Sequence, residues 1–182
     1  MIIQLKSYLC LLLMGFGVAM ISGCTPKSSE PSLRLNNFYQ VSDDVYRSGQ
    51  PSKDQMAQLE QQGIKSIINL RAMHSDRDEV DGTNLTSYWV RINAGNITDE
   101  KMISVLKLIK KSTKPVLIHC WHGSDRTGVT IAMYRLVFQN WSKQAAIDEL
   151  MQPEYGHHYN YYPNIVQYLD NVDIDYIKAQ VL

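Results

Sequence analysis

The chain has 182 residues, of which 45% are hydrophobic and 20% are charged. This composition fits one globular domain and is too apolar for a disordered chain. The 18 basic and 18 acidic residues leave no formal net charge, so nothing in the charge favours nucleic acid as a partner.

The first residues of the chain have the pattern of an export signal. Lys6 precedes an apolar run from Tyr8 to Ile21. This run is shorter than the ~20 residues that a bilayer-spanning helix needs. It therefore predicts a signal peptide over residues 1–23.

The end of this signal resembles the bacterial lipobox, because residues 21–24 read ISGC. In lipobox proteins the chain is cut just before the cysteine, which is then acylated. The resemblance implies a lipid anchor at Cys24, and Thr25, where an Asp would favour the inner membrane, resembles the pattern of outer-membrane retention. We therefore expect a bacterial envelope protein, anchored by lipid on the periplasmic face of the outer membrane. The alternative is a plain secretory signal with a chance cysteine.

Residues 24–37 are polar and include two prolines, which is typical of a flexible tether. We expect the folded domain to cover residues 38–182. Cys10 lies in the signal and Cys24 is the acylation candidate, so Cys120 is the single cysteine of the domain. A lone thiol in an oxidising compartment suggests that the chemistry of the protein requires it.

Strand and helix patterns alternate along the domain. β-branched and apolar runs predict strands over residues 45–47, 64–70, 88–92 and 116–119. Capping residues and helical periodicity predict helices over residues 52–62, 98–111, 127–140 and 142–151, and one that begins at Pro163. The polar stretch 71–86 is expected to be loop. This alternation predicts an α/β fold with a central, largely parallel, twisted sheet flanked by helices.

Residues 119–128, HCWHGSDRTG, join the last predicted strand to a helix. Such a loop can turn its backbone N–H groups inward, and the helix adds its positive end, which together bind an anion. Gly123 and Gly128 permit tight turns and close backbone approach. Arg126 offers a planar fork that binds two phosphate oxygens at once.

The same positive field favours the thiolate of Cys120 over its thiol, and a thiolate is a competent nucleophile. The pattern therefore predicts covalent phosphoryl transfer to sulfur. Thr127 is placed to hydrogen-bond the sulfur as it departs, and His119 is placed to orient the loop.

The loop resembles the His-Cys-x5-Arg-Ser/Thr-Gly signature of protein tyrosine and dual-specificity phosphatases. VYRSGQP (residues 45–51) and GIKSIINLR (residues 63–71) resemble the opening of the small dual-specificity-like branch, so the resemblance spans roughly residues 40–170. It implies a dual-specificity-phosphatase-like fold, a phosphocysteine intermediate, no cofactor and no metal. It makes Cys120 the nucleophile of a phosphomonoester hydrolase. The implied phosphate-binding residues are Trp121, His122, Gly123, Ser124, Asp125 and Arg126.

The general acid departs from the family pattern. Many relatives carry an Asp on a separate loop, but here that loop reads NAGNITD over residues 93–99, with Asn at the earlier positions. Asp125 is our preferred candidate because some relatives have an Asp-Arg pair inside the signature loop. Asp99 is the second candidate, although it also suits the helix N-terminus, and solvent is the third.

Other polar residues have ordinary interpretations beside functional ones. The charged run that includes Asp76 is expected to be a solvated loop, with substrate contact as the alternative. His157 and His158, in a tyrosine-rich segment, are expected to pack ordinarily, with the rim of a pocket or a metal site as alternatives.

Two rival functions use the same loop. A pseudophosphatase would bind phosphate without turnover, and a rhodanese-like sulfurtransferase would also use a loop cysteine. The presence of Cys120 and Arg126 disfavours the first, and their spacing disfavours the second. The expected partners are a phosphorylated substrate and, through the lipid anchor, a membrane. A phosphotyrosine protein, a phosphorylated lipid or sugar, and an inositol phosphate all stay open as substrates.

Overall fold

The computed structural model describes residues 33–182 of the chain. A five-stranded sheet lies at its centre, in the order β1-β2-β5-β3-β4. Its strands are β1 (Tyr39–Ser42), β2 (Val45–Ser48), β3 (Ser66–Asn69), β4 (Thr86–Trp89) and β5 (Val116–His119). Strand β1 is an antiparallel edge strand, and the other four are parallel. The predicted fold class is therefore confirmed.

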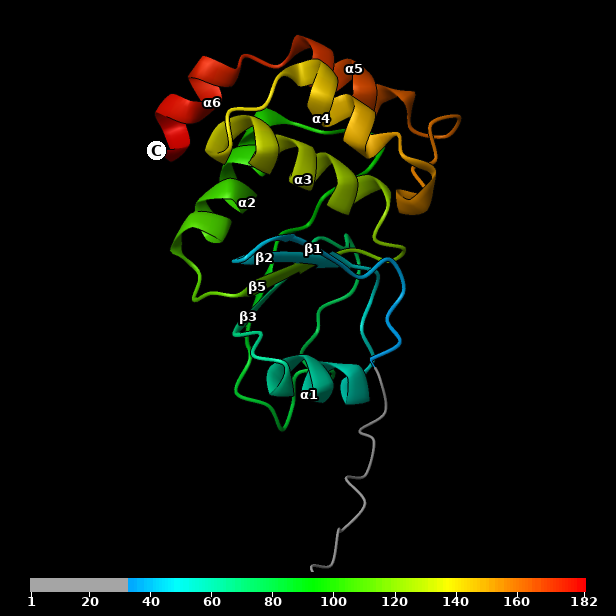
Figure 1. Cartoon of the computed structure of the whole chain (residues 1–182), viewed down its shortest axis with the longest axis vertical. Coiled ribbons are helices and arrows are strands. Elements are labelled where there is room, and N and C mark those ends of the chain that lie inside the picture. Colours follow the sequence, from blue (N-terminus) through cyan, green and yellow to red (C-terminus); the bar gives the residue numbers. More distant parts are fainter. Residues whose placement is uncertain (1–32) are drawn as a thin grey trace, which may run out of the picture. The chain divides into compact units, whose positions relative to one another are not determined.

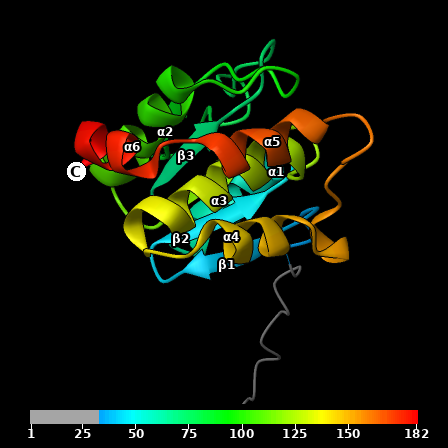
Figure 2. The ribbon, with the colours of Figure 1, turned by 90° about the horizontal axis from the view of Figure 1, so that it is seen from above.

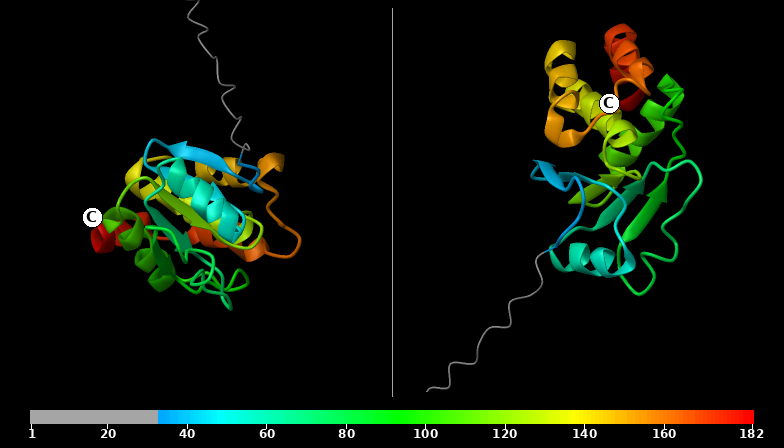
Figure 3. Two further views of the ribbon diagram at one scale, coloured as in Figure 1. Left: turned by 90° about the horizontal axis from the view of Figure 1, so that it is seen from below. Right: turned by 90° about the vertical axis from the view of Figure 1, so that its right-hand side faces the viewer.

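Helices cover both faces of the sheet (Figure 1). One face carries α1 (Lys53–Gln61). The other face carries α2 (Asp99–Lys111), α3 (Asp125–Phe138), α4 (Lys143–Leu150), α5 (Pro163–Asn171) and α6 (Ile174–Val181). A short 3-10 turn, Pro153–Tyr155, follows α4. Figure 2 shows α3 between α4 and α5, and the right-hand view of Figure 3 shows the layers edge-on.

Helix α3 is the centre of the larger core. Its residues from Thr127 to Met133 are buried, so it has no solvated face and packs on the sheet and on its neighbouring helices. The smaller core lies between the sheet and α1, where Met56, Leu59 and Leu117 are fully buried. The two cores lie on opposite faces of β5, and buried residues of α3 belong to the larger one, so packing positions both ends of the signature loop.

The structure changes some of the predicted elements. Helix α3 begins at Asp125 and not at residue 127, because the signature loop turns directly into the helix. Strand β4 begins at Thr86, two residues before the predicted start at residue 88. The edge strand β1 and the final helix α6 were not predicted. Strand β1 has only four residues, YQVS, and lies at the edge of the sheet. None of its side chains is fully buried, so its sequence has no apolar pattern that predicts a strand.

The predicted signal peptide (1–23), the acylation site at Cys24 and most of the predicted tether lie outside the described residues. The end of that tether is described, and it packs on the domain. Leu33 and Leu35 contact the smaller core, and the Asn36 carbonyl accepts a hydrogen bond from the Gly49 N–H at 2.7 Å. Between residues 33 and 182, no helix combines the length and apolarity that a membrane crossing requires.

Candidate active site

Three buried polar residues mark the carboxyl ends of the central strands. Ser48, Asn69 and His119 pair across β2, β3 and β5, and each is 0% exposed. Apolar strands do not bury such a row without partners, because an unpaired polar group costs about 1–3 kcal/mol. The row marks the edge where parallel sheets bind ligands, and the chain enters the signature loop from it.

The signature loop wraps around the sulfur of Cys120, which is 2% exposed. The Gly123 N–H points inward and donates to the sulfur at 3.3 Å. Gly123 has φ +79, and a Cβ there would lie 2.6 Å from backbone atoms of Ser48 and Gly49. Only glycine fits this turn, so the close backbone approach predicted for Gly123 is present.

The end of β2 braces the loop from outside. Buried Arg47 donates from Nη2 to the Gly123 carbonyl at 2.8 Å, and its guanidinium lies 4.0 Å from the ring centroid of Tyr155. Burial lowers the pKa of Arg47, although nearby groups such as Tyr155 oppose that shift. The Gln50 N–H donates to the Trp121 carbonyl at 3.0 Å. These contacts occupy the carbonyls of Gly123 and Trp121, while the Gly123 N–H is directed at the sulfur.

The start of α3 is left free for a ligand. Ser124, at the N-cap, makes no side-chain cap hydrogen bond. Within the described residues, Arg126 Nε and Thr127 Oγ1 are buried without hydrogen-bond partners. The predicted hydrogen bond from Thr127 to the sulfur is thus not formed here, and the Gly123 N–H makes one instead. Uncapped N–H groups and a buried guanidinium nitrogen without a partner are what an oxyanion satisfies.

A carboxylate–histidine pair lies behind the loop. His119 Nε2 and Asp76 Oδ2 are 2.7 Å apart, and both side chains are 0% exposed. Asn69 and Gln50 donate to Asp76 Oδ1 at 2.9 and 3.0 Å. Burial is the largest single influence and would raise the pKa of Asp76, but the hydrogen bonds from His119 and Gln50 and the nearby imidazoles together outweigh it and lower the pKa. The prediction of a solvated loop is wrong for Asp76, because this carboxylate is buried and bonds His119, Asn69 and Gln50.

A second carboxylate–histidine cluster lies at the start of α3. Asp125 accepts from His157 Nδ1 at 2.8 Å, from the His158 N–H at 2.9 Å and from His158 Nδ1 at 2.8 Å. Burial alone would raise the pKa of Asp125, but these hydrogen bonds outweigh it and lower the pKa to about 2. The assignment of Asp125 as general acid stays a prediction, and the carboxylate is ionised at neutral pH.

The second acid candidate, Asp99, has a different partner. Its Oδ1 accepts the hydroxyl of Tyr168 at 2.8 Å at the start of α2. Burial and then this hydrogen bond raise the pKa of Tyr168 far above its usual value. Asp99 therefore joins α2 to α5.

Two hollows flank the loop. One, of about 470 Å³, is lined by Trp121, His122, Arg71 and residues at the start of α1. The Arg71 guanidinium lies 4.3 Å from the Trp121 ring centroid and forms one wall. The other hollow, of about 220 Å³, is lined by Ala94, His122, Asp125, Arg126, His158, Tyr161 and Tyr162. Trp121 and His122, predicted to bind phosphate, thus lie at the rim, with His122 between the two hollows.

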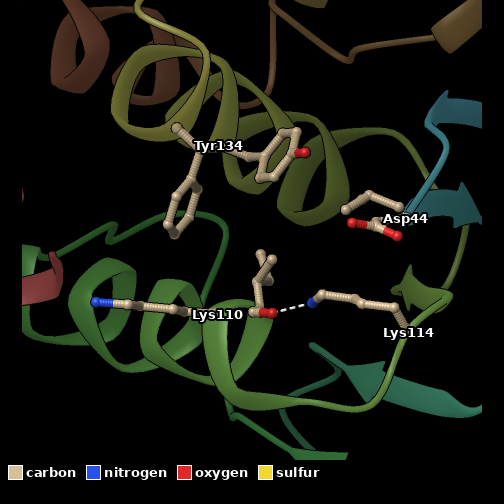
Figure 4. Close-up of a pocket in the computed structure, with 7 residues that line it drawn as sticks. Asp44, Lys110, Lys114 and Tyr134 are labelled. Carbon is tan, nitrogen blue, oxygen red and sulfur yellow. Dashed lines mark hydrogen bonds between the residues drawn. The ribbon is translucent and has the colours of Figure 1, made fainter.

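A third hollow lies at the opposite, amino end of β2 and β5 (Figure 4). It is lined by Asp44, Lys110, Lys114 and Tyr134, among others. Its cations already have acceptors: Lys110 donates to the carbonyls of Val181 and Leu182, and Lys114 donates to the Ile109 carbonyl. Because these cations are already bonded, the hollow is not a candidate active site, and a substitution in it can serve as a control for substitutions in the signature loop.

One group of side chains has the composition of a metal site. Ligand atoms of His74, Asp76 and Glu79 lie within 4.8 Å of one another. His74 already bonds Glu79 at 2.7 Å, and both oxygens of Asp76 are occupied by His119, Asn69 and Gln50. Among these ligand groups only Glu79 Oε2 is buried without a partner in the described domain, and one free oxygen does not make a metal site.

A strand, a glycine-containing loop around a buried cysteine, and a helix whose first turn carries an arginine together define a Cys-x5-Arg phosphate loop on an α/β fold. The sequence model described as "Tyrosine phosphatase family" matches residues 32–180. The chain belongs to this family.

Known proteins give the same assignment. The chain is 33% identical over 129 residues to the dual specificity protein phosphatase TpbA of Pseudomonas aeruginosa (strain UCBPP-PA14), a match that covers 70% of this chain and 57% of TpbA. An inositol diphosphatase of Oryza sativa subsp. japonica is 32% identical over 122 residues, covering 62% of this chain and 59% of its own. The chain thus matches less than two thirds of the length of these curated relatives.

A crystal structure of a P. aeruginosa TpbA variant in complex with phosphotyrosine is also similar. It has a TM-score of 0.73 and 28% sequence identity, and the match covers 85% of this chain and 94% of that one. The core catalytic domain of a PP-IP phosphatase from S. cerevisiae, solved with citrate, has a TM-score of 0.69 and 27% identity, with 80% and 90% covered. These likenesses extend over nearly all of the described domain.

Proposed function

We propose that this protein is a cysteine-dependent phosphomonoester hydrolase that acts through a phosphocysteine intermediate. One observation carries the proposal. The chain from Cys120 to Arg126 closes around the sulfur, with the Gly123 N–H directed at it and Arg126 Nε buried without a partner in the described domain. A phosphoryl group satisfies all of these donors at once.

The roles follow from the positions. The thiolate of Cys120 attacks phosphorus, and Arg126 with the loop N–H groups holds the equatorial oxygens as charge shifts onto them. His119 is a supporting residue, since its ring bonds Asp76 and lies 3.3 Å from the Cys120 carbonyl. The Thr127 hydroxyl, buried without a partner in the described domain, is assigned the hydrogen bond to the departing sulfur.

The walls of the site favour an aryl phosphate such as phosphotyrosine. Trp121 is 53% exposed on one side of the loop and Tyr161 is 81% exposed on the other. Flat aromatic surfaces contact an aromatic ester group favourably. TpbA has been solved with phosphotyrosine, which supports this choice, whereas the inositol diphosphatase relatives support an inositol phosphate as the second candidate.

The test is phosphate release from p-nitrophenyl phosphate, phosphotyrosine peptide and inositol phosphates. Cys120→Ser is expected to abolish release from every substrate that the wild type hydrolyses. Lys110→Met, in the hollow of Figure 4, is the control and is expected to keep wild-type turnover. Sulfur transfer from thiosulfate to cyanide, or phosphate release that survives Cys120→Ser, would overturn the proposal.

We also propose that the mature protein is anchored by acyl chains on Cys24, on the periplasmic face of the bacterial outer membrane. The support is the apolar run that ends in ISGC at residues 21–24. Acyl chains bind membranes because each buried CH₂ contributes about 0.8 kcal/mol. Radiolabelled palmitate is expected to label the wild type, and Cys24→Ala is expected to lose both the label and membrane attachment. Export of Cys24→Ala with unchanged membrane attachment would reject the anchor.

A further inference from the structure

The two histidines that bond Asp125 differ in one respect. The side chain of His157 is 1% exposed, whereas that of His158 is 42% exposed. Both use Nδ1 toward the carboxylate. Within the described domain His157 Nε2 is buried without a partner, while His158 lines the hollow beside Arg126. One imidazole is thus enclosed, and the other can reach a ligand.

The acid candidates of the signature region are poorly suited to donate a proton. Asp125 has a pKa of about 2 and accepts three hydrogen bonds, so it carries no proton at neutral pH. Asp99 is bonded to Tyr168. In the preceding loop, Asn93 accepts the Gly95 N–H and has no acidic proton. Phosphate esters with basic leaving groups need a donor, which typically contributes ~10²–10⁴-fold.

Hydrogen bonds to Asp125 fix the orientation of the His158 ring. The anionic Asp125 bonds His158 Nδ1 through Oδ2, and its Oδ1 accepts the backbone N–H of His158. The charged or titratable groups that line the hollow with it are His122, at 5.5 Å between ring centroids, Arg126, Tyr161 and Tyr162. A carboxylate that orients an imidazole and leaves Nε2 free is a recurrent arrangement for proton transfer.

We propose that His158, oriented by Asp125, is the proton donor and acceptor of the reaction. The inference rests on the proposed phosphatase function and assigns to it a catalytic residue. Asp125 becomes a positioning residue, which holds the ring and its charge but transfers no proton itself.

The proton balance has two steps. First, the Cys120 thiolate forms the P–S bond as the ester P–O bond breaks, and the leaving oxygen takes the proton from His158 Nε2. Second, water attacks the phosphocysteine, neutral His158 accepts its proton, and the P–S bond breaks. Inorganic phosphate, the thiolate and protonated His158 result, so both groups return to their starting states.

The chain provides matched controls. His157 bonds the same carboxylate with the same atom but is enclosed, so His157→Gln removes a cluster contact and leaves the proton donor. His122 lines the same hollow on the loop itself and has no carboxylate partner in the described domain. If His122 were the donor, His122→Gln would produce the effect assigned to His158.

The experiment compares two leaving groups. We expect His158→Gln to lower kcat for phenyl phosphate by about 10²-fold and to change kcat for 2,4-dinitrophenyl phosphate by less than about threefold, since a good leaving group needs no proton. The alkaline limb of the kcat/KM pH profile for phenyl phosphate is expected to disappear in His158→Gln. His157→Gln and His122→Gln are expected to keep both the limb and the ratio between the two substrates.

The two substrates separate a failure of the role assigned to His158 from a failure of the proposed phosphatase function. Equal losses on the two substrates, or no loss on phenyl phosphate, would overturn the role of His158 while leaving the phosphatase intact. A selective loss in His122→Gln would transfer the role to His122 and also overturn the proposal. His158→Asn is the second variant if His158→Gln unfolds. A wild type that hydrolyses neither ester would instead reject the proposed function.

Discussion

Two carboxylate–histidine clusters lie on opposite sides of the phosphate loop, and the same chemical pair differs in its surroundings. Behind the loop, Asp76 and His119 are both 0% exposed and surrounded by further donors. In front, Asp125 holds one enclosed and one accessible histidine. The rear cluster, Asp76 with His119, is enclosed and can only support the edge of the sheet. The front cluster, Asp125 with His157 and His158, can also contact a ligand. Exposure, and not residue type, separates a structural pair from a candidate catalytic one.

The largest effect is expected at the rear cluster. Asp76→Ala would leave buried His119 Nε2 without its partner and remove one of the two acceptors of each amide of Asn69 and Gln50, at a cost of about 3 kcal/mol of unfolding free energy. Urea unfolding measures it. Asp76→Asn keeps a carbonyl acceptor and serves as control, with a smaller loss expected. An Asp76→Ala protein of unchanged stability would show that the rear cluster is not structural.

The front cluster is expected to give a pH-dependent stability. The pKa of Asp125 is about 2 in the folded state, against 3.8 for the free side chain. The unfolded chain therefore takes up protons first, so the contribution of Asp125 is present above pH 3.8 and disappears as the pH falls through about 2. Its full size is about 2 kcal/mol.

Urea unfolding at stepped pH values between 5 and 2 tests this expectation. The wild type should lose about 2 kcal/mol more than Asp125→Ala over that range, because Asp76 and the other carboxylates are present in both proteins. Parallel pH curves for the two proteins would mean that His157 and His158 do not hold Asp125 in solution as they do here.

The smallest effect is expected at Asn37, which connects the N-terminal segment of the domain to the signature loop and to Tyr155. Asn37 donates from Nδ2 to the Tyr155 carbonyl at 2.9 Å and, at 3.3 Å, to the His122 carbonyl and Ser124 Oγ. Asn37→Gly suits the positive φ of 55 and removes these contacts, so a loss of about 1 kcal/mol is expected in urea unfolding.

Asn36→Ala is the neighbouring control for that change. The contact of Asn36 with the Gly49 N–H uses its backbone carbonyl, which the substitution keeps. A change within about 0.5 kcal/mol is expected. If both substitutions cost the same, the segment is held by its backbone, and the Asn37 amide contributes nothing specific to the contact with the signature loop.

The sequence by itself determined the parallel core strands, most of the helices and the phosphate loop, because each depends on neighbouring residues. A strand, two glycines, an arginine six residues after a cysteine and a helix start follow one another within residues 116–128, so local pattern and geometry agree. The same local pattern predicted that Cys120 and Arg126 bind one phosphate group, and Arg126 lies in the first turn of α3, directly after the loop that begins at Cys120.

Only the tertiary structure decided which other polar residues belong to the site. Asp76 stands in a charged run and was expected in solvent, yet it is buried against His119, 43 residues later in the chain. His157 and His158 looked like packing residues, yet they bond Asp125 across 32 and 33 residues. Electrostatic pairing depends on distance in space and on burial, and neither quantity is encoded in the neighbours of a residue along the chain.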